Sequence, residues 1–187
     1  MTIAEKRLTL AEFLALPERK PALRYLPDGT ITQKVSPKTK HGIIQGALVT
    51  RVNRFAEPGR VARAIPEIRC TFGGASHVPD VGVFRWERIP RDPDGRVADN
   101  ILIPPDLAVE IVSPGQSTTG LVELCLWYVA NGVRLALVLD PADESALVVQ
   151  PDRTVRVLRG EDVFEAGEAL PGFALGIGEL FQTLRLD

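Results

Sequence analysis

The chain has 187 residues, of which 45% are hydrophobic and 25% charged, and its formal net charge is −2. This length supports one domain with a sizeable core, and we expect residues 1–187 to form it. The charge lacks the strongly basic balance of dedicated nucleic-acid-binding proteins, although a local basic patch is compatible with it. The two cysteines, Cys70 and Cys125, form no CxxC pattern and indicate neither a disulfide framework nor a zinc site.

The N-terminal segment MTIAEKRLTLAEFLALPERK carries charged residues throughout and has no long apolar core. We therefore expect no signal peptide. No run in the chain approaches the roughly 20 apolar residues of a membrane span, so we expect no membrane contact. The low cysteine content fits a reducing compartment, and we predict a cytoplasmic protein.

The first elements are predicted by their end signals. Thr9 and Glu12 form a capping box in LTLAEFLALP, which predicts a short helix that ends before Pro17. In RYLPDGTITQKVS, the pair Asp28-Gly29 separates two extended pieces, which indicates a hairpin. The segment HGIIQGALVTRVNRF then predicts an amphipathic helix over residues 41–55. Its buried face is expected to contain Ile43, Ile44, Ala47, Leu48, Val52 and Phe55.

Strands and helices alternate in the rest of the chain. RVARAIPEIRCTF and VPDVGVFRW are predicted strands, followed by the polar loop RWERIPRDPDGRVADN. LAVEIV, the helix TTGLVELCLWYVANG and VRLALVLDP form a strand–helix–strand unit, whose strands we expect to be parallel with a right-handed crossover. SALVVQ and TVRVLR predict a hairpin, and the tail predicts a turn and a short helix or extended piece. The expected fold class is a single α/β domain.

Three acidic residues lie in or beside apolar strands: Glu67 in AIPEIRC, Asp80 in HVPDVGVF and Glu110 in LAVEIV. A carboxylate inside such a strand costs several kcal/mol unless it is paired or bound to a metal. If these strands are neighbours, the carboxylates meet at one end of the sheet and form the oxygen-rich setting that Mg²⁺ or Mn²⁺ prefers. In the alternative interpretation, each acid ends a strand at the surface. The occurrence of all three favours the metal site, in which we expect at least one raised carboxyl pKa.

Several longer segments together resemble the Uma-type family of restriction endonucleases, which belongs to the PD-(D/E)XK nuclease superfamily. The resemblance runs nearly end to end, through LAEFLALP, DGTITQKVSPKTKHGIIQGAL, VPDVGVF, PPDLAVEIVSP, YVANGVRLALVLDP and LPGFALGIGELF. Each piece alone is weak, but their order and spacing are specific. The resemblance implies a restriction-endonuclease-like fold, in which a central mixed β-sheet is flanked by α-helices.

The resemblance also implies an activity and its residues. It implies a Mg²⁺- or Mn²⁺-dependent endonuclease that hydrolyses DNA phosphodiester bonds. Asp80 and Glu110 would bind the metal, with Glu67 as a neighbour in the same catalytic site. His41 falls where this family usually has a histidine, and its role is either helix capping or a contact near the site. Because nucleases that cut both strands often work as symmetric pairs, a homodimer is expected.

The chain departs from the family pattern at the catalytic lysine. The superfamily position two residues after the strand glutamate is Val112, and the displaced position on the following helix is Leu124. We expect Leu124 to face the sheet near Glu110. No lysine follows Lys40. Near the first turn, where the family commonly has an acid, this chain has Arg24 and Tyr25.

Two functions follow from this departure. The chain is either a nuclease in which another cation replaces the lysine, with Lys34, Lys38 and Lys40 as candidates, or a catalytically silent relative that retains DNA or partner binding. Other residues carry weaker predictions. His77 is expected in a loop, and Ser113 has no histidine partner that the sequence indicates. The arginines of FRWERIPRDPDGR indicate either a solvated loop or a DNA-contacting patch.

Overall fold

A computed structural model of the chain describes residues 7–186. The first six residues, which belong to the segment on which the signal-peptide prediction rests, lie outside the described residues. The largest sheet has six strands in the order β10-β9-β8-β7-β6-β3. These strands are β3 (Ala62–Pro66), β6 (Val81–Arg85), β7 (Leu107–Ile111), β8 (Leu135–Asp140), β9 (Ser145–Val149) and β10 (Val155–Arg159).

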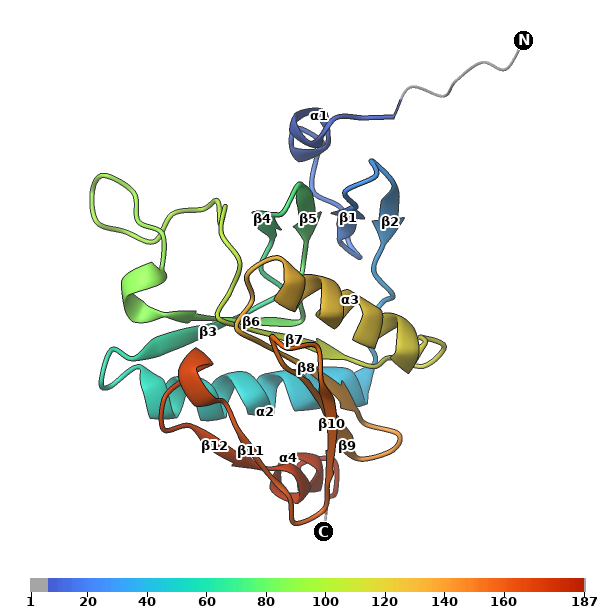
Figure 1. Ribbon diagram of the computed structural model, residues 1–187, viewed down its shortest axis with the longest axis vertical. Coiled ribbons are helices and arrows are strands. Elements are labelled where there is room, and N and C mark those ends of the chain that lie inside the picture. The colour runs from blue at the N-terminus through green and yellow to red at the C-terminus, as the bar shows by residue number, and fades with distance from the viewer. Residues whose placement is uncertain (1–6, 187) are drawn as a thin grey trace.

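Two helices, α2 (Thr39–Ala56) and α3 (Thr118–Ala130), cover opposite faces of this sheet (Figure 1). β7 and β8 are parallel and joined through α3, as predicted, whereas the other neighbouring pairs in this sheet are antiparallel. The sheet is therefore mixed and flanked by helices, which confirms the predicted fold class. No helix among residues 7–186 is both long and apolar enough to cross a membrane.

The two faces of β7 contribute to two different cores, because successive side chains of a strand point to opposite faces. Leu107, Val109 and Ile111 pack in the core that also contains the buried face of α2. Ala108 packs in the second core, which contains α3. Glu110 alternates with the first set and so faces α3, where the Tyr128 hydroxyl reaches it. The face of β7 to which a side chain points therefore decides which helix it contacts.

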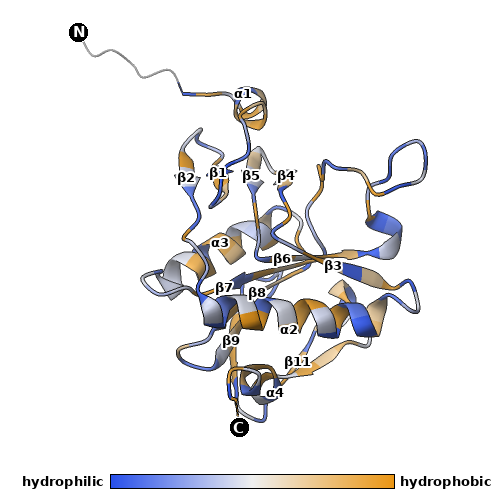
Figure 2. Cartoon of the chain, turned by 180° about the vertical axis from the view of Figure 1, so that it is seen from behind, coloured by the Kyte–Doolittle hydropathy of each residue, from blue (hydrophilic) through white to orange (hydrophobic). Residues whose placement is uncertain are grey.

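The buried face of α2 differs in part from the prediction. Its buried residues repeat every three or four positions, and blue and orange bands alternate along the helix (Figure 2). Ile43 and Phe55 lie outside this face, at 37% and 44% exposure, whereas His41 lies on it. The buried residues are His41, Ile44, Leu48, Val52 and Ala56.

A smaller sheet, in the order β2-β1-β5-β4, stands beside the large one. Its strands are β1 (Leu23–Tyr25), β2 (Ile31–Gln33), β4 (Cys70–Phe72) and β5 (Ala75–His77), with α1 (Leu10–Leu14) next to them. The predicted capping box is present: Glu12 N donates to Thr9 Oγ1 and Thr9 N donates to the Glu12 carboxylate. The hairpin at Asp28-Gly29 is confirmed as well, since β1 pairs antiparallel with β2.

Two predictions around residue 70 were wrong. The single strand RVARAIPEIRCTF is broken at Glu67, whose φ of 49° ends β3, and β4 belongs to the other sheet. His77 is in no loop but in β5, where it is 1% exposed. The glycine pair Gly73-Gly74, both with positive φ, makes the turn between β4 and β5. Strands of three residues are too short to show an alternating pattern in sequence.

The C-terminal part completes the core on the α2 side. The hairpin between β9 and β10 is confirmed by their antiparallel pairing. Beyond it, the tail forms a second hairpin that the sequence did not indicate, followed by the predicted short helix. These elements are β11 (Val163–Glu165), β12 (Ala174–Gly176) and α4 (Ile177–Gln182), and two short 3-10 turns occur at Trp86–Arg88 and Gly167–Ala169.

Candidate functional site

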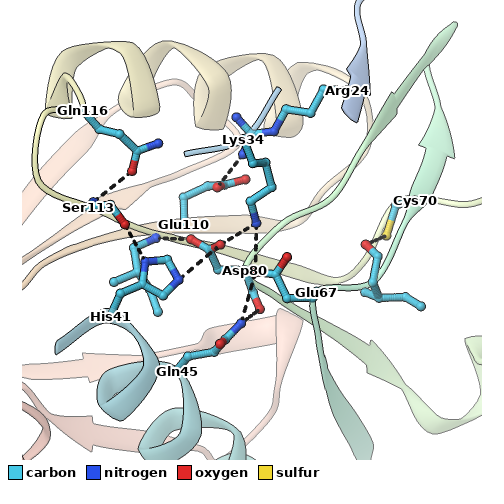
Figure 3. Close-up of polar contacts among 12 residues, drawn as sticks. Arg24, Lys34, His41, Gln45, Glu67, Cys70, Asp80, Glu110, Ser113 and Gln116 are labelled. Atoms are coloured by element: carbon cyan, nitrogen blue, oxygen red, sulfur yellow. Dashed lines mark hydrogen bonds and ion pairs between the residues drawn. The ribbon is translucent and has the colours of Figure 1, made fainter. Parts of the chain in front are cut away.

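Asp80 is the centre of the polar site (Figure 3). It directly precedes β6 and is 2% exposed. Its two carboxylate oxygens have different surroundings: Oδ2 accepts a hydrogen bond from Ile111 N at 2.7 Å, whereas Oδ1 lies 2.5 Å from Lys34 Nζ and 3.4 Å from His41 Nε2. Burial opposes ionisation, but His41 and Lys34 outweigh it and hold the pKa of the Asp80 carboxyl well below its usual range.

His41 reaches this carboxylate from the first turn of α2. Its imidazole is 5% exposed, and its Nδ1 lies 3.0 Å from Ser113 Oγ, a contact that the sequence did not indicate. The sequence could not indicate this contact because the two residues are 72 positions apart. The other ring nitrogen, Nε2, is buried and makes no hydrogen bond; it faces Asp80 Oδ1. His41 therefore belongs to the site rather than to the helix cap.

Glu67 is exposed and lies at the rim of the site. β3 ends just before this residue, and Glu67 N donates a hydrogen bond to the Asp80 carbonyl oxygen at 3.0 Å. Gln45 Nε2 donates to the same carbonyl at 2.7 Å. Within the described chain, His41, Glu67 and Asp80 form one group whose possible metal-ligand atoms all lie within 4.8 Å of one another. Two carboxylate oxygens and one imidazole nitrogen are thus gathered at one point.

Glu110 is also buried, at 1% exposure, but it faces α3 and is not a member of that group. Arg24 Nη2 donates to one of its oxygens at 2.9 Å, and Tyr128 Oη donates to the other at 2.8 Å. Burial raises the pKa of the Glu110 carboxyl, and the charge of Asp80 adds to this, against the opposing effects of Arg24 and Lys34. A raised carboxyl pKa, which the sequence predicted for at least one of the three acids, is therefore found at Glu110.

Lys34 supplies a cation in the middle of these acids. It follows β2 directly, and its Nζ lies 2.5 Å from Asp80 Oδ1 and 3.0 Å from Glu67 Oε1. Its side chain is only 7% exposed. Burial lowers its pKa, but Glu110, Asp80 and Glu67 outweigh burial and raise it, so the ammonium stays charged. Of the three lysines considered from sequence, this one reaches the carboxylates.

Both cations come from the same face of the β1–β2 hairpin. Arg24 pairs with Thr32 across the two strands, and Lys34 N donates to the carbonyl of Ala22 at 2.9 Å, which continues the pairing by one step. Directly opposed residues of an antiparallel pair project to the same face, and so do residues two positions apart. The hairpin therefore directs Arg24 to Glu110 and Lys34 to Asp80.

Leu124 is the helix position of the displaced lysine, and its side chain packs against the core on the α3 side. Leu124 is only partly buried, at the edge of the core on the α3 side. The α3 residue that contacts Glu110 is Tyr128, and the charge of Glu110 also acts on Cys125, whose pKa burial raises far above its usual range. Val112 packs against the same core. Neither Leu124 nor Val112 brings a charge to the site.

The arginine-rich loop lies away from these residues. Asp80 stands before the first residue of β6, whereas Arg85 is its last, so the loop begins at the opposite end of that strand. Several of its arginines are paired with neighbouring acids: Arg85 with Glu87, Arg88 with Asp106 and Arg96 with Asp94. These contacts favour the solvated-loop interpretation.

A family model and one solved structure agree with this fold. Residues 10–178 match the model of the family Uma2, described as "Putative restriction endonuclease". The crystal structure of a "putative nuclease belonging to DUF820" from Anabaena variabilis ATCC 29413 superposes with a TM-score of 0.90 at 38% identity and covers 95% of this chain and 99% of that one. A DrdV–DNA complex matches with a TM-score of only 0.39 at 15% identity, over 76% of this chain and 11% of that one. No significant match is found among curated proteins.

Proposed function

Because the chain belongs to the Uma2 family of restriction-endonuclease-like proteins, we propose that it is a metal-dependent endonuclease that hydrolyses DNA phosphodiester bonds. The proposed catalytic and metal-binding residues are Asp80, Glu67 and Glu110. The observation that carries the proposal is the position of Lys34, whose ammonium lies between Asp80 and Glu67 in a chain that has no lysine at the family's usual positions.

The donor set fits a divalent cation. His41, Glu67 and Asp80 converge within 4.8 Å, and the buried Nε2 of His41 has no hydrogen-bond partner. We propose Mg²⁺ or Mn²⁺, which carboxylates bind in proteins of this kind. A divalent ion in such a site acidifies a water molecule and neutralises charge that develops on a phosphate.

The chain's own residues have separate roles in this proposal. Ile111 N and Gln45 fix the position of Asp80, whose Oδ1 would be the atom that holds the ion. Lys34 stabilises the negative charge that develops on the phosphate oxygens as the bond breaks. A preorganised donor of this kind contributes roughly 10²–10³ in rate. Arg24 and Tyr128 hold the Glu110 carboxylate in a fixed position.

A second candidate function is supported by the Arg24–Glu110 contact. The two charged groups are 2.9 Å apart and nearly buried, so the ion pair occupies a carboxylate that the family pattern assigns to the metal. A catalytically silent protein that retains DNA or partner binding would have this property. Cleavage activity separates the two functions directly.

The test is a supercoiled-plasmid nicking assay with Mg²⁺ or Mn²⁺. We expect the wild-type protein to nick the plasmid with metal and not with excess chelator, and Asp80→Asn to lower the rate by at least about 100-fold. The matched control is Asp94→Asn, which changes an exposed acid in the distant loop and should keep the wild-type rate. Equal nicking by the wild type and Asp80→Asn, or no nicking by the wild type, contradicts the proposal.

The expected homodimer and the cytoplasmic location stay predictions. The dimer is supported by the family resemblance and by the two-fold symmetry that double-strand cleavage commonly uses. Sedimentation velocity at micromolar concentration, with and without a DNA duplex, measures it. A monomer under both conditions contradicts the prediction.

A further inference from the structure

We propose that His41 is itself a metal ligand through Nε2, oriented by Ser113, and that this nitrogen makes the site select a transition-metal ion such as Mn²⁺ over Mg²⁺. The proposal rests on the proposed function only for the presence of a metal at Asp80 and Glu67. It concerns which ion is bound and which atom of this chain decides it.

The first argument is the pair of contacts that the imidazole makes. Nδ1 lies 3.0 Å from Ser113 Oγ, and Ser113 is fixed in turn because its backbone N–H donates to Gln116 Oε1 at 2.9 Å. The ring is only 5% exposed, so its orientation is set by these neighbours rather than by water. Nε2 then faces Asp80 Oδ1 at 3.4 Å without a hydrogen bond.

The second argument concerns the proton on the ring. A neutral imidazole carries one N–H, and the hydrogen bond at one nitrogen decides which nitrogen has the proton. When Nδ1–H donates to Ser113 Oγ, Nε2 presents its lone pair to a carboxylate oxygen. Lys34 Nζ, 2.5 Å from Asp80 Oδ1, balances the charge of that oxygen but leaves the Nε2 lone pair without a partner, and a metal ion close to both atoms would supply one. A metal-binding histidine usually has this arrangement, with an oxygen partner on its other nitrogen.

The third argument concerns the kind of ion. Mg²⁺ demands near-ideal octahedral oxygen coordination, whereas imidazole nitrogen suits later first-row divalent metals best. Mn²⁺ lies between them, because it is mostly bound by oxygen ligands but belongs to the transition series in which affinity for nitrogen rises. The group of His41, Glu67 and Asp80 offers one nitrogen and two oxygens. Replacing the nitrogen by an oxygen should therefore weaken Mn²⁺ binding more than Mg²⁺ binding.

The test measures coordination directly. Because the chain has two histidines, His77→Asn leaves His41 as the sole imidazole. We expect pulsed EPR of Mn²⁺ bound to this variant to show coupling to a directly coordinated ¹⁴N. The coupling should change to that of ¹⁵N after labelling with ¹⁵N-histidine. The same spectrum from the wild type checks that the variant is folded at the site. Mn²⁺ that binds without nitrogen coupling overturns the proposal.

Calorimetry tests the selectivity and the role of Ser113. We expect His41→Asn to weaken Mn²⁺ binding by about 10–100-fold and Mg²⁺ binding by less than about 3-fold. Ser113→Ala should weaken Mn²⁺ binding in the same direction, and Ser113→Thr, which keeps the hydroxyl, should restore it. Equal losses for both ions, or no change with Ser113→Ala, contradict this account.

The outcomes separate this proposal from the proposed function. Nitrogen-coupled Mn²⁺ in a protein that nicks no plasmid supports the ligand assignment and contradicts the nuclease. Nicking that is equally fast with Mg²⁺ and Mn²⁺, and unchanged in His41→Asn, supports the nuclease and contradicts the ligand assignment.

Discussion

At the scale of single residues, buried polar groups in this protein divide into those with partners and those without. Asp80 and Glu110 each use both carboxylate oxygens. His77, in contrast, is buried with neither ring nitrogen hydrogen-bonded, and its ring lies 4.6 Å from the Trp127 ring and 5.4 Å from the Tyr128 ring, measured between centroids. Such a histidine packs as an aromatic ring and resists protonation.

The titration of His77 gives a prediction for stability against pH. Burial, and then the charge of Arg24, lowers the pKa of His77 from 6.5 to about 4. Between these values the unfolded chain binds a proton that the folded protein does not, so the free energy of unfolding falls as the pH falls. The loss is about 3 kcal/mol once the pH is below 4.

Denaturant unfolding at a series of pH values from 7 to 4 measures this effect. The comparison variant is His77→Phe, which keeps an aromatic ring beside Trp127 and Tyr128 but cannot be protonated. Its stability should depend less steeply on pH than that of the wild type, by close to one proton. Parallel curves for the two proteins show that His77 is accessible to protons in the folded state.

At the scale of elements, the β1–β2 hairpin is the part that completes the site. Its register places Arg24 and Lys34 on one face, so a single hairpin delivers two cations to two carboxylates that face different helices. The Asp28-Gly29 turn was predicted from the sequence. The pairing of β1 with β2 around this turn is sufficient to place Arg24 and Lys34 on one face of the hairpin. The sequence did not indicate that this face packs against the ends of β6 and β7.

Removal of Arg24 tests how the hairpin and the large sheet depend on each other. Arg24→Met leaves the Glu110 charge buried without its partner, which should lower the free energy of unfolding by about 3–5 kcal/mol at pH 8. Without Arg24, the pKa of Glu110 rises further above its unfolded value. Because Glu110 can then take up a proton in the folded state, the destabilisation should be smaller at pH 5 than at pH 8.

The control is a double-mutant cycle with Glu110→Gln. In the Glu110→Gln background, Arg24→Met should cost much less than in the wild type, since no buried carboxylate remains to be paired. Additive effects of the two substitutions, at both pH values, contradict a direct energetic coupling across the two sheets.

At the scale of the whole molecule, the sequence predicted the large α/β unit well and the connections around the site poorly. Long periodic segments such as α2 and the β7–α3–β8 unit follow from their own apolar pattern. Short strands such as β4, β5, β11 and β12 do not, since pairing rather than pattern holds them. The site was difficult to predict for the same reason, because Ser113 and Lys34 contact residues that are distant along the chain.

The exposed charges of the molecule predict where DNA would bind under the proposed function. The exposed lysines Lys38 and Lys40 line a surface cavity of about 540 Å³ together with His41 and Ser113. The exposed Arg91 and Arg96 belong to the distant loop. Lys38→Ala with Lys40→Ala should weaken duplex binding and reduce the slope of log affinity against log salt by about 1 per lysine. Fluorescence anisotropy measures both quantities.

The matched control for that measurement is Arg91→Ala with Arg96→Ala, which removes the same charge from the other end of β6. This pair should leave the affinity and the salt slope close to those of the wild type. A larger loss with the arginine pair than with the lysine pair places the DNA on the loop and away from the site.

The central claim is that Lys34 supplies the cation missing at Leu124, and single-turnover cleavage of a labelled DNA duplex tests it most directly. With saturating Mn²⁺ and protein, Lys34→Met should lower the cleavage rate by roughly 10²–10³-fold, as expected for loss of a preorganised charge. Leu124→Lys in the otherwise unchanged chain should leave the rate near that of the wild type. If Lys34→Met cuts as fast as the wild type, or Leu124→Lys accelerates cleavage strongly while Lys34 is present, the assignment of Lys34 is contradicted.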